Sequence, residues 1–137
     1  RGELEALAKQ IYPATEFRGS LFGLELNKAF DEADLFVLPG TGGLAVQQAM
    51  AHALPVIVAE GDGSQADMVT AANGWLLPPG EENALGVALA EALLDTKRLR
   101  DKGAEPFRLV QEKLNLEEMA AAYIQAVTEV NPLKVGR

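Results

Sequence analysis

Short apolar runs alternate in this chain with segments whose apolar residues recur at helical spacing. The runs 35–38 and 55–59 are continuously apolar, which is typical of strands buried on both faces of a sheet. The segment 44–53 between them is made mostly of small and apolar residues and predicts a helix. Two buried strands joined by a crossover helix should lie parallel. We take this strand–helix–strand unit as the centre of the fold.

Further strands are predicted on either side of this unit. Segment 15–18 is interpreted as a short strand that ends in a turn at 19–20. Segment 75–77 is a third buried run, ended by two prolines and a glycine. Helical patterns cover the remaining segments, 3–11, 24–33, 65–70, 81–94, 96–102, 105–114 and 116–130.

Two features of the C-terminal helices follow from single residues. The helical pair 96–102 and 105–114 is expected to be broken near Gly103. Asn115 is expected to cap the last helix, because Glu118 stands three residues on in capping-box register. Strands that alternate with helices predict an α/β fold: a parallel sheet of about four strands flanked by helices, with a helical C-terminus.

Composition and charge narrow the function classes. The chain has 137 residues, 48% of them hydrophobic and 23% charged, as expected for one globular domain. Its net charge of −8 argues against binding to nucleic acid, which needs a basic surface. The single histidine and the absence of cysteine argue against a metal site. Lack of cysteine also fits a cytoplasmic location.

The glycine loop that follows the first central strand carries the candidate chemistry. Pro39, Gly40, Thr41, Gly42 and Gly43 cannot continue the strand, and the predicted helix starts directly after them. The first turn of a helix leaves N–H groups unpaired and carries partial positive charge, which favours an anion. The spacing matches neither a Walker P-loop nor Gly-x-Gly-x-x-Gly. A tight turn without a ligand is the alternative interpretation.

A series of motifs, taken together, resembles a known family. The series is ADLFVLP, the glycine loop, L-x-x-x-Q-A-M-A-x-x-LPVIVA, D-M-V, N-G-W-L-L-P-P-G and a Leu/Arg-rich helical region. It is similar to the retaining glycosyltransferases of family 4, and specifically to the C-terminal, Rossmann-like, donor-binding half of their GT-B fold. The resemblance covers about residues 4–130. It implies a partial nucleotide-sugar-binding domain over 1–131 and a tail over 132–137.

The resemblance also implies that parts of the enzyme are missing. The donor half of the family has parallel strands in the order 3-2-1-4-5-6, and the strands here look like the third to the sixth. The first two strands, the basic residues that clamp the donor diphosphate and the N-terminal acceptor domain would lie outside this chain. We therefore expect a fragment that is inactive alone and contains no catalytic residue.

Site residues follow from the family motif. It has two carboxylates spaced Glu-x7-Glu, and these positions hold Gly40 and Gln48 here. A neutral amide has one group that accepts and one that donates a hydrogen bond, where a carboxylate has two that accept. Weaker or different binding of the nucleotide sugar is therefore expected. The predicted donor-binding residues are Gly40, Thr41, Gly42, Gly43, Leu44 and Gln48. The predicted base-binding residues are Gly19, Ser20 and Leu21.

The implied substrate is a UDP- or GDP-linked hexose, transferred to a glycan, lipid or small acceptor without a metal or cofactor. Membrane contact is expected to be peripheral at most, through the basic residues of 97–102. A homodimer through exposed sheet edges is a further expectation. The alternative function is a degenerate, non-catalytic domain of the same fold that acts as a binding or scaffold module, because both motif carboxylates are absent.

Overall fold

The structure is a computed structural model of the chain, and it describes residues 2–40, 42–61, 63–81, 83–113 and 115–130. Contacts within the chain divide it into two units, Arg1–Asp31 and Glu32–Arg137. Each unit is described by itself. The predicted tail 132–137 lies outside the described residues.

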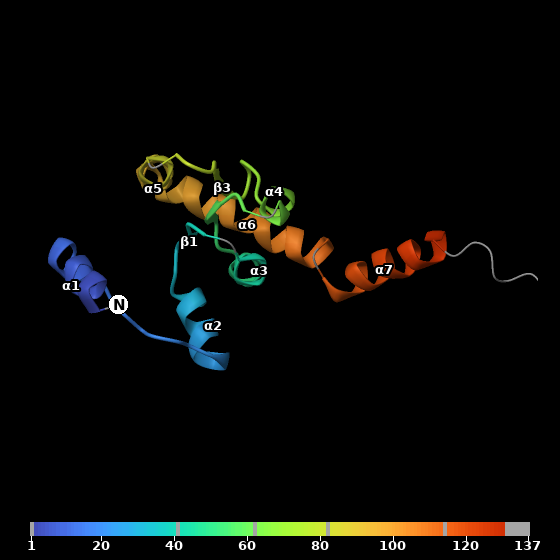
Figure 1. Cartoon of the computed structure of the whole chain (residues 1–137), viewed down its shortest axis with the longest axis horizontal. Helices are drawn as coiled ribbons and strands as arrows, with labels where there is room; N and C mark the ends of the chain where they lie inside the picture. Colours follow the sequence, from blue (N-terminus) through green and yellow to red (C-terminus); the bar gives the residue numbers. More distant parts are fainter. Residues whose placement is uncertain (1, 41, 62, 82, 114, 131–137) are drawn as a thin grey trace, which may run out of the picture. The chain divides into compact units, whose positions relative to one another are not determined.

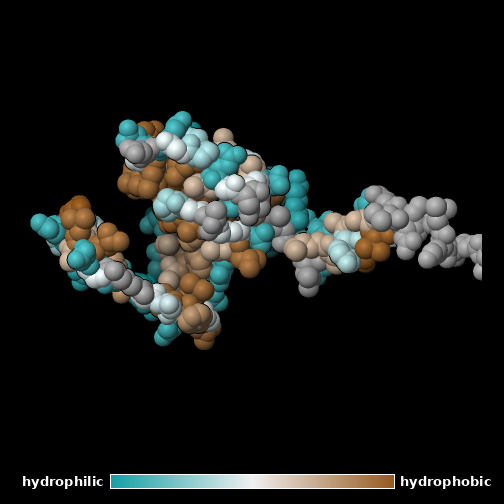
Figure 2. Space-filling model, viewed as in Figure 1, coloured by the Kyte–Doolittle hydropathy of each residue, from teal (hydrophilic) through white to brown (hydrophobic). Residues whose placement is uncertain are grey.

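The first unit contains two helices, α1 (Gly2–Ile11) and α2 (Gly23–Asp31). Residues 15–18, where a strand was predicted, have no regular secondary structure, so that prediction is wrong. A strand needs a neighbour that pairs with its backbone groups, and Phe17 is 46% exposed here. Leu4, Leu7 and Ile11 recur at helical spacing in α1 and are exposed. Figure 2 shows hydrophobic residues on the surface of this helix.

The second unit is built on a parallel sheet of three strands in the order β1-β2-β3 (Figure 1). They are β1 (Phe36–Leu38), β2 (Val56–Ala59) and β3 (Gly74–Leu77). Helix α3 (Gly43–Ala51) connects β1 to β2, and the short α4 (Ser64–Met68) lies between β2 and β3 in the chain. The predicted strand–helix–strand unit is confirmed, including its parallel pairing.

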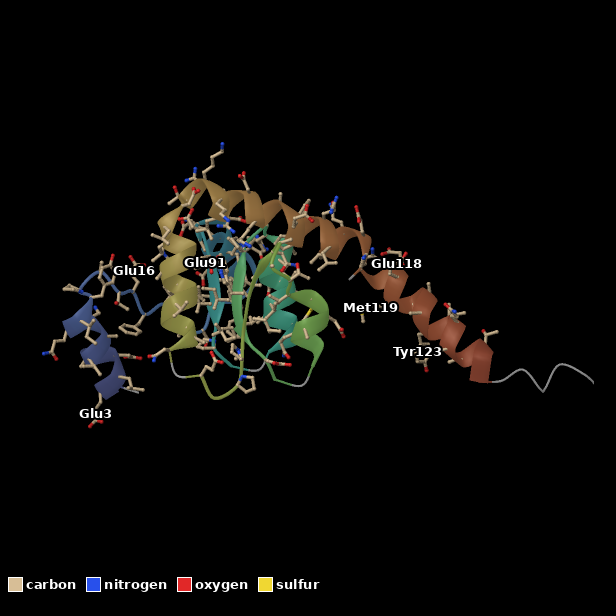
Figure 3. The ribbon with its side chains drawn as sticks, turned by 90° about the horizontal axis from the view of Figure 1, so that it is seen from above. Glu3, Glu16, Glu91, Glu118, Met119 and Tyr123 are labelled. Atoms are coloured by element: carbon tan, nitrogen blue, oxygen red, sulfur yellow. The ribbon has the colours of Figure 1, made fainter. Side chains whose placement is uncertain are left out.

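Three helices follow the sheet: α5 (Ala84–Leu94), α6 (Thr96–Glu112) and α7 (Leu116–Val130). Figure 3 shows α5 on one side of the sheet and α3 on the other. With both faces covered, the central strand β2 is buried from Val56 to Val58, which explains its continuously apolar sequence. Asn115 caps α7 as predicted, because its Oδ1 accepts the Glu118 backbone N–H at 2.8 Å.

Gly103 does not break a helix, which corrects the prediction of a helical pair. Helix α6 runs without interruption through Gly103 and the buried Pro106. A Cβ atom at Gly103 would lie 2.2 Å from the backbone oxygen of Ala53, so glycine permits close packing of α6 on the end of α3. That end is a left-handed turn at Ala53 (φ 58°), where Leu54 N donates to Ala49 O at 3.1 Å.

The fold class is therefore the expected one, a Rossmann-like parallel sheet flanked by helices with a helical C-terminus. The core on the α5 side of the sheet consists of buried apolar residues from the sheet, α5 and α6, namely Ile57, Leu77, Ala88, Ala92 and Leu99. Of the helices that the structure describes, none has both the length and the apolar character that crossing a bilayer requires.

Candidate functional site

The candidate site lies where β1 and β2 end at the same edge of the sheet. Leu38 is paired with Val58, so the glycine loop after β1 and the segment after β2 leave the sheet next to each other. This is the edge at which parallel α/β sheets bind ligands. Helix α3 begins there at Gly43, and its N-cap residue Gly42 has no side chain that could accept the amide hydrogens of the first turn.

The start of α3 is open to solvent. Leu44 is 83% exposed, and Gly40, Gly42 and Gly43 are partly exposed. A Cβ atom at Gly42 would lie 2.8 Å from the Leu38 side chain, so the loop passes close over the end of β1. The predicted contact at Thr41 falls outside the described residues. The backbone amides near Gly43 can therefore be reached by an anion from outside.

Gln48 lies just over one turn into α3 and is partly buried. Side chains on a helix lean toward its N-terminus, so Gln48 leans toward the glycine loop. The preceding Gln47 has a different role, because its Nε2 donates to the sulfur of Met68 at 3.5 Å and so connects α3 to α4. His52 is the C-cap of α3 and thus stands at the opposite end of this helix from the loop.

Gln65 is a candidate residue that the sequence reasoning missed. It belongs to the first turn of α4, just after the end of β2, and its side chain is fully buried. Neither its Nε2 nor its Oε1 has a hydrogen-bond partner among the described residues. Buried amides are normally paired, so this amide requires an explanation. Nothing in the sequence marked this residue, because a polar side chain on a short helix is usually exposed.

The predicted base-binding residues lie in the other unit. Gly19, Ser20 and Leu21 belong to the connection between α1 and α2, and Gly19 has a left-handed backbone (φ 67°). The chain bends at Ser20, next to this glycine. Contact of these residues with a base stays a prediction.

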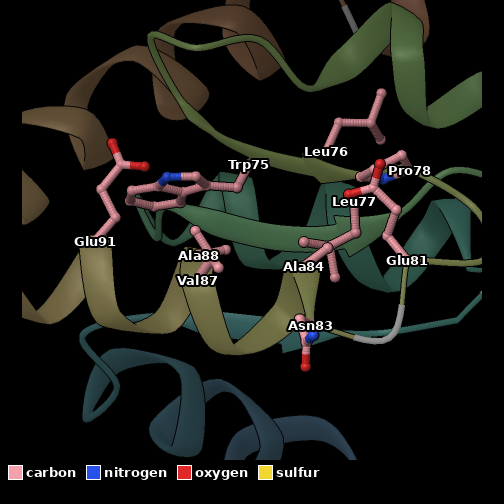
Figure 4. A pocket seen from close by; sticks show the side chains of 10 residues that line it. All are labelled: Trp75, Leu76, Leu77, Pro78, Glu81, Asn83, Ala84, Val87, Ala88 and Glu91. Atoms are coloured by element: carbon pink, nitrogen blue, oxygen red, sulfur yellow. The ribbon is translucent and has the colours of Figure 1, made fainter.

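A separate cavity of about 430 Å³ lies between β3 and α5 (Figure 4). Its walls include Trp75, Leu77 and Val87, with Glu81 and Glu91 among the polar residues that line it. None of the predicted site residues lines this cavity. It therefore does not form part of the site at the glycine loop.

Lys102 of α6 lies over the ring of Trp75, one of the residues that line this cavity. Its Nζ donates to the backbone oxygen of Ala71 and lies 4.9 Å from the centroid of the Trp75 ring. Burial, and then repulsion by Arg98, lowers the pKa of Lys102, while Glu91 opposes the shift. These contacts join α6 to β3 and to Ala71 in the segment before β3.

Within the described part of the chain, His, Asp and Glu residues do not gather in any group of three or more that could hold a metal ion.

Comparisons with known proteins all find glycosyltransferases or a sucrose-phosphate synthase. A family model described as "Glycosyl transferases group 1" matches residues 1–95. Among solved structures, sucrose-phosphate synthase from Thermosynechococcus elongatus matches with a TM-score of 0.76 and 26% identity, over 94% of this chain and 34% of that one.

Two curated relatives are similar in sequence. A GDP-mannose-dependent alpha-mannosyltransferase of Mycobacterium tuberculosis is 36% identical over 98 residues, which is 68% of this chain and 26% of that protein. A putative colanic acid biosynthesis glycosyltransferase, WcaL of Escherichia coli, is 30% identical over 135 residues, which is 86% of this chain and 32% of that protein. The chain thus spans about a quarter to a third of the length of these relatives.

Proposed function

The chain belongs to the glycosyl transferases group 1 family, and we propose that it forms part of the nucleotide-sugar-binding half of a longer enzyme of that family. Its fold is the Rossmann-like α/β fold of GT-B glycosyltransferases. The observation that carries the proposal is the open start of α3 at the carboxyl edge of the sheet. Exposed amides of a glycine loop, together with the positive end of a helix, suit a negatively charged ligand.

The proposed ligand is a sugar linked to UDP or GDP. Its diphosphate would accept hydrogen bonds from the amides of Gly42, Gly43 and Leu44, while Gln48 would reach hydroxyl groups from the second turn of α3. The name of the mycobacterial relative, which specifies GDP-mannose as its donor, supports a nucleotide sugar. Transfer of a hexose with retention of configuration follows from the family resemblance alone.

The rest of the catalytic machinery is proposed to lie outside this chain. The relatives are three to four times longer than the segment they share with it, which leaves ample length for an acceptor domain. A diphosphate donor needs cationic partners, and no Lys or Arg is present between Pro39 and Gln48. We therefore expect residues 1–137 alone to complete no glycosyl transfer. A cytoplasmic location and a homodimer through the sheet edges stay predictions.

One observation favours a second candidate function. Gly40 and Gln48 replace the two carboxylates of the family motif, and a site that has lost both would no longer need to hold a donor. In that case the domain would be a degenerate binding or scaffold module that contacts a partner chain.

Calorimetric titration of the intact protein with UDP- and GDP-sugars separates the two functions. Saturable binding, weakened in Gln48→Ala and unchanged in the control Gln111→Ala, which replaces an exposed glutamine of α6, is expected if the site holds a donor. Loss of one neutral hydrogen bond should weaken binding by about five- to tenfold. Absence of binding to every nucleotide sugar tested would reject the donor site and favour the scaffold module.

A further inference from the structure

The amide of Gln65 is buried without the hydrogen bonds that burial requires. Its side chain has 0% exposure, and both its Nε2 and its Oε1 are unpaired in the described part of the chain. A buried amide in this state has lost its hydrogen bonds to water and gained none in return. Such a group in a folded protein indicates a missing partner.

The position of Gln65 indicates where that partner would be. It is the second residue of α4, which begins shortly after β2 ends at Ala59. The pairing of Leu38 with Val58 brings this edge beside the glycine loop, and the contact of Gln47 with Met68 ties α4 to α3. Gln65 thus belongs to the first turn of α4, which is the end of this helix that follows the carboxyl end of β2 in the chain.

The chemistry of the amide restricts the partner. A glutamine side chain donates through Nε2 and accepts through Oε1. A phosphate only accepts and would leave Oε1 unpaired, whereas an ammonium group only donates and would leave Nε2 unpaired. A hydroxyl group both donates and accepts, so hydroxyls can satisfy both atoms. Sugars present several hydroxyls on neighbouring carbons.

We infer that Gln65 is a donor-specificity residue, whose amide hydrogen-bonds hydroxyls of the bound nucleotide sugar, on either the ribose or the transferred hexose. The inference rests on the proposed function and adds a residue to that site. It assigns Gln65 to the sugar part of the ligand and leaves the diphosphate to the start of α3.

The segment before α4 can give the ligand access to this amide. Gly61 and Gly63 are exposed, and Gly63 has a left-handed backbone (φ 92°) with open space around it. Gly61 and Gly63 can change their backbone conformation at little steric cost, because glycine has no Cβ. Donor binding would then turn the amide to the ligand and supply the hydrogen bonds that the ligand-free chain lacks.

The test compares Gln65→Met with the wild type in the intact protein. Methionine keeps the length of the side chain and removes both unpaired polar atoms. We expect the thermal midpoint of the ligand-free protein to stay the same or rise. We expect nucleotide-sugar affinity to fall by about tenfold, as when a site loses a hydrogen bond to a substrate hydroxyl. The matched control is Gln111→Met, because Gln111 is an exposed glutamine of α6 outside the candidate site, and this variant should bind the donor like the wild type.

The ligands are UDP, GDP and their hexose conjugates. Weaker binding of conjugates alone assigns Gln65 to the hexose, and equally weaker binding of the nucleoside diphosphates assigns it to the ribose. If the wild type binds a nucleotide sugar and Gln65→Met binds it with the same affinity, the inference about Gln65 is wrong and the proposed function stands. Failure of the wild type to bind any of these ligands would reject the proposed function itself. If Gln65→Met does not fold, Gln65→Leu is read by the same criteria.

Discussion

Replacement of Gly103 by alanine should destabilise the protein, although Gly103 lies inside a helix. The new Cβ would lie 2.2 Å from the backbone oxygen of Ala53, whereas real Cβ contacts stay beyond 3.0 Å. That oxygen cannot move easily, because Ala53 N donates to Met50 O at 3.0 Å and Leu54 N donates to Ala49 O at 3.1 Å. Helix α6 must therefore move away from α3.

The expected size of this effect is a balance of two terms. Overpacking a close contact costs about 1–3 kcal/mol. Alanine in place of glycine favours a helix by about 1 kcal/mol. Because the clash is with a backbone oxygen, its cost should lie in the upper part of that range, about 2–3 kcal/mol. The net loss should then be about 1–2 kcal/mol, seen as a lower urea midpoint at an unchanged m-value.

Gly86 of α5 offers the matched control for this change. It is also a helical glycine, but apart from its chain neighbours and the backbone of its own helix no atom of the described residues lies within 4 Å of the place where its Cβ would stand. Gly86→Ala should therefore stabilise the protein by up to about 1 kcal/mol. If Gly103→Ala is neutral or stabilising like Gly86→Ala, the close packing of α6 on the Ala53 turn is wrong.

Three further substitutions test the framework of the site by the same urea assay. Ala53→Gly should stabilise the folded protein by about 0.5–1 kcal/mol. The left-handed backbone at Ala53 is strained for alanine, and relief of this strain should exceed the entropy that glycine adds to the unfolded chain. A loss of stability would refute the left-handed turn. Gly74→Ala should cost about 3 kcal/mol, because its Cβ would meet the backbone oxygen of Val56 at 2.2 Å, where β3 starts beside β2; tolerance would contradict the β2–β3 register. Asp95→Ala should cost about 1 kcal/mol, because Asp95 Oδ1 accepts two backbone N–H groups at the start of α6, and Asp95→Asn should retain most of that stability.

The parts of the fold that the sequence predicted are those in which local pattern and tertiary contacts agree. The continuous apolar run at β2 is buried on both faces by flanking helices, as predicted. The run at β1 forms a strand but is only partly buried, with Val37 36% exposed, so its predicted burial on both faces is wrong. The predicted strand at 15–18 is absent because a strand forms only where its backbone groups pair with those of a neighbouring strand, whatever its composition. The predicted helix break at Gly103 was wrong because a glycine in a helix can also mark a place where another backbone packs closely against the helix.

The candidate site was predictable only in part, for similar reasons. The glycine loop stands out in the sequence because several glycines precede a helix at the end of a buried strand. Gln65 could not be found in this way, since nothing in its neighbours indicates that a polar residue on a short helix is fully buried. Only coordinates show that both atoms of its amide are unpaired.

The measurement that tests the central claim most directly is the change in backbone amide NMR signals of the intact protein on addition of a UDP- or GDP-sugar. The proposed donor site predicts the largest saturable shifts at Gly42, Gly43 and Leu44, where the first turn of α3 is open to solvent. Saturable shifts centred instead on the cavity between β3 and α5, or no shifts with either nucleotide sugar, would contradict the account.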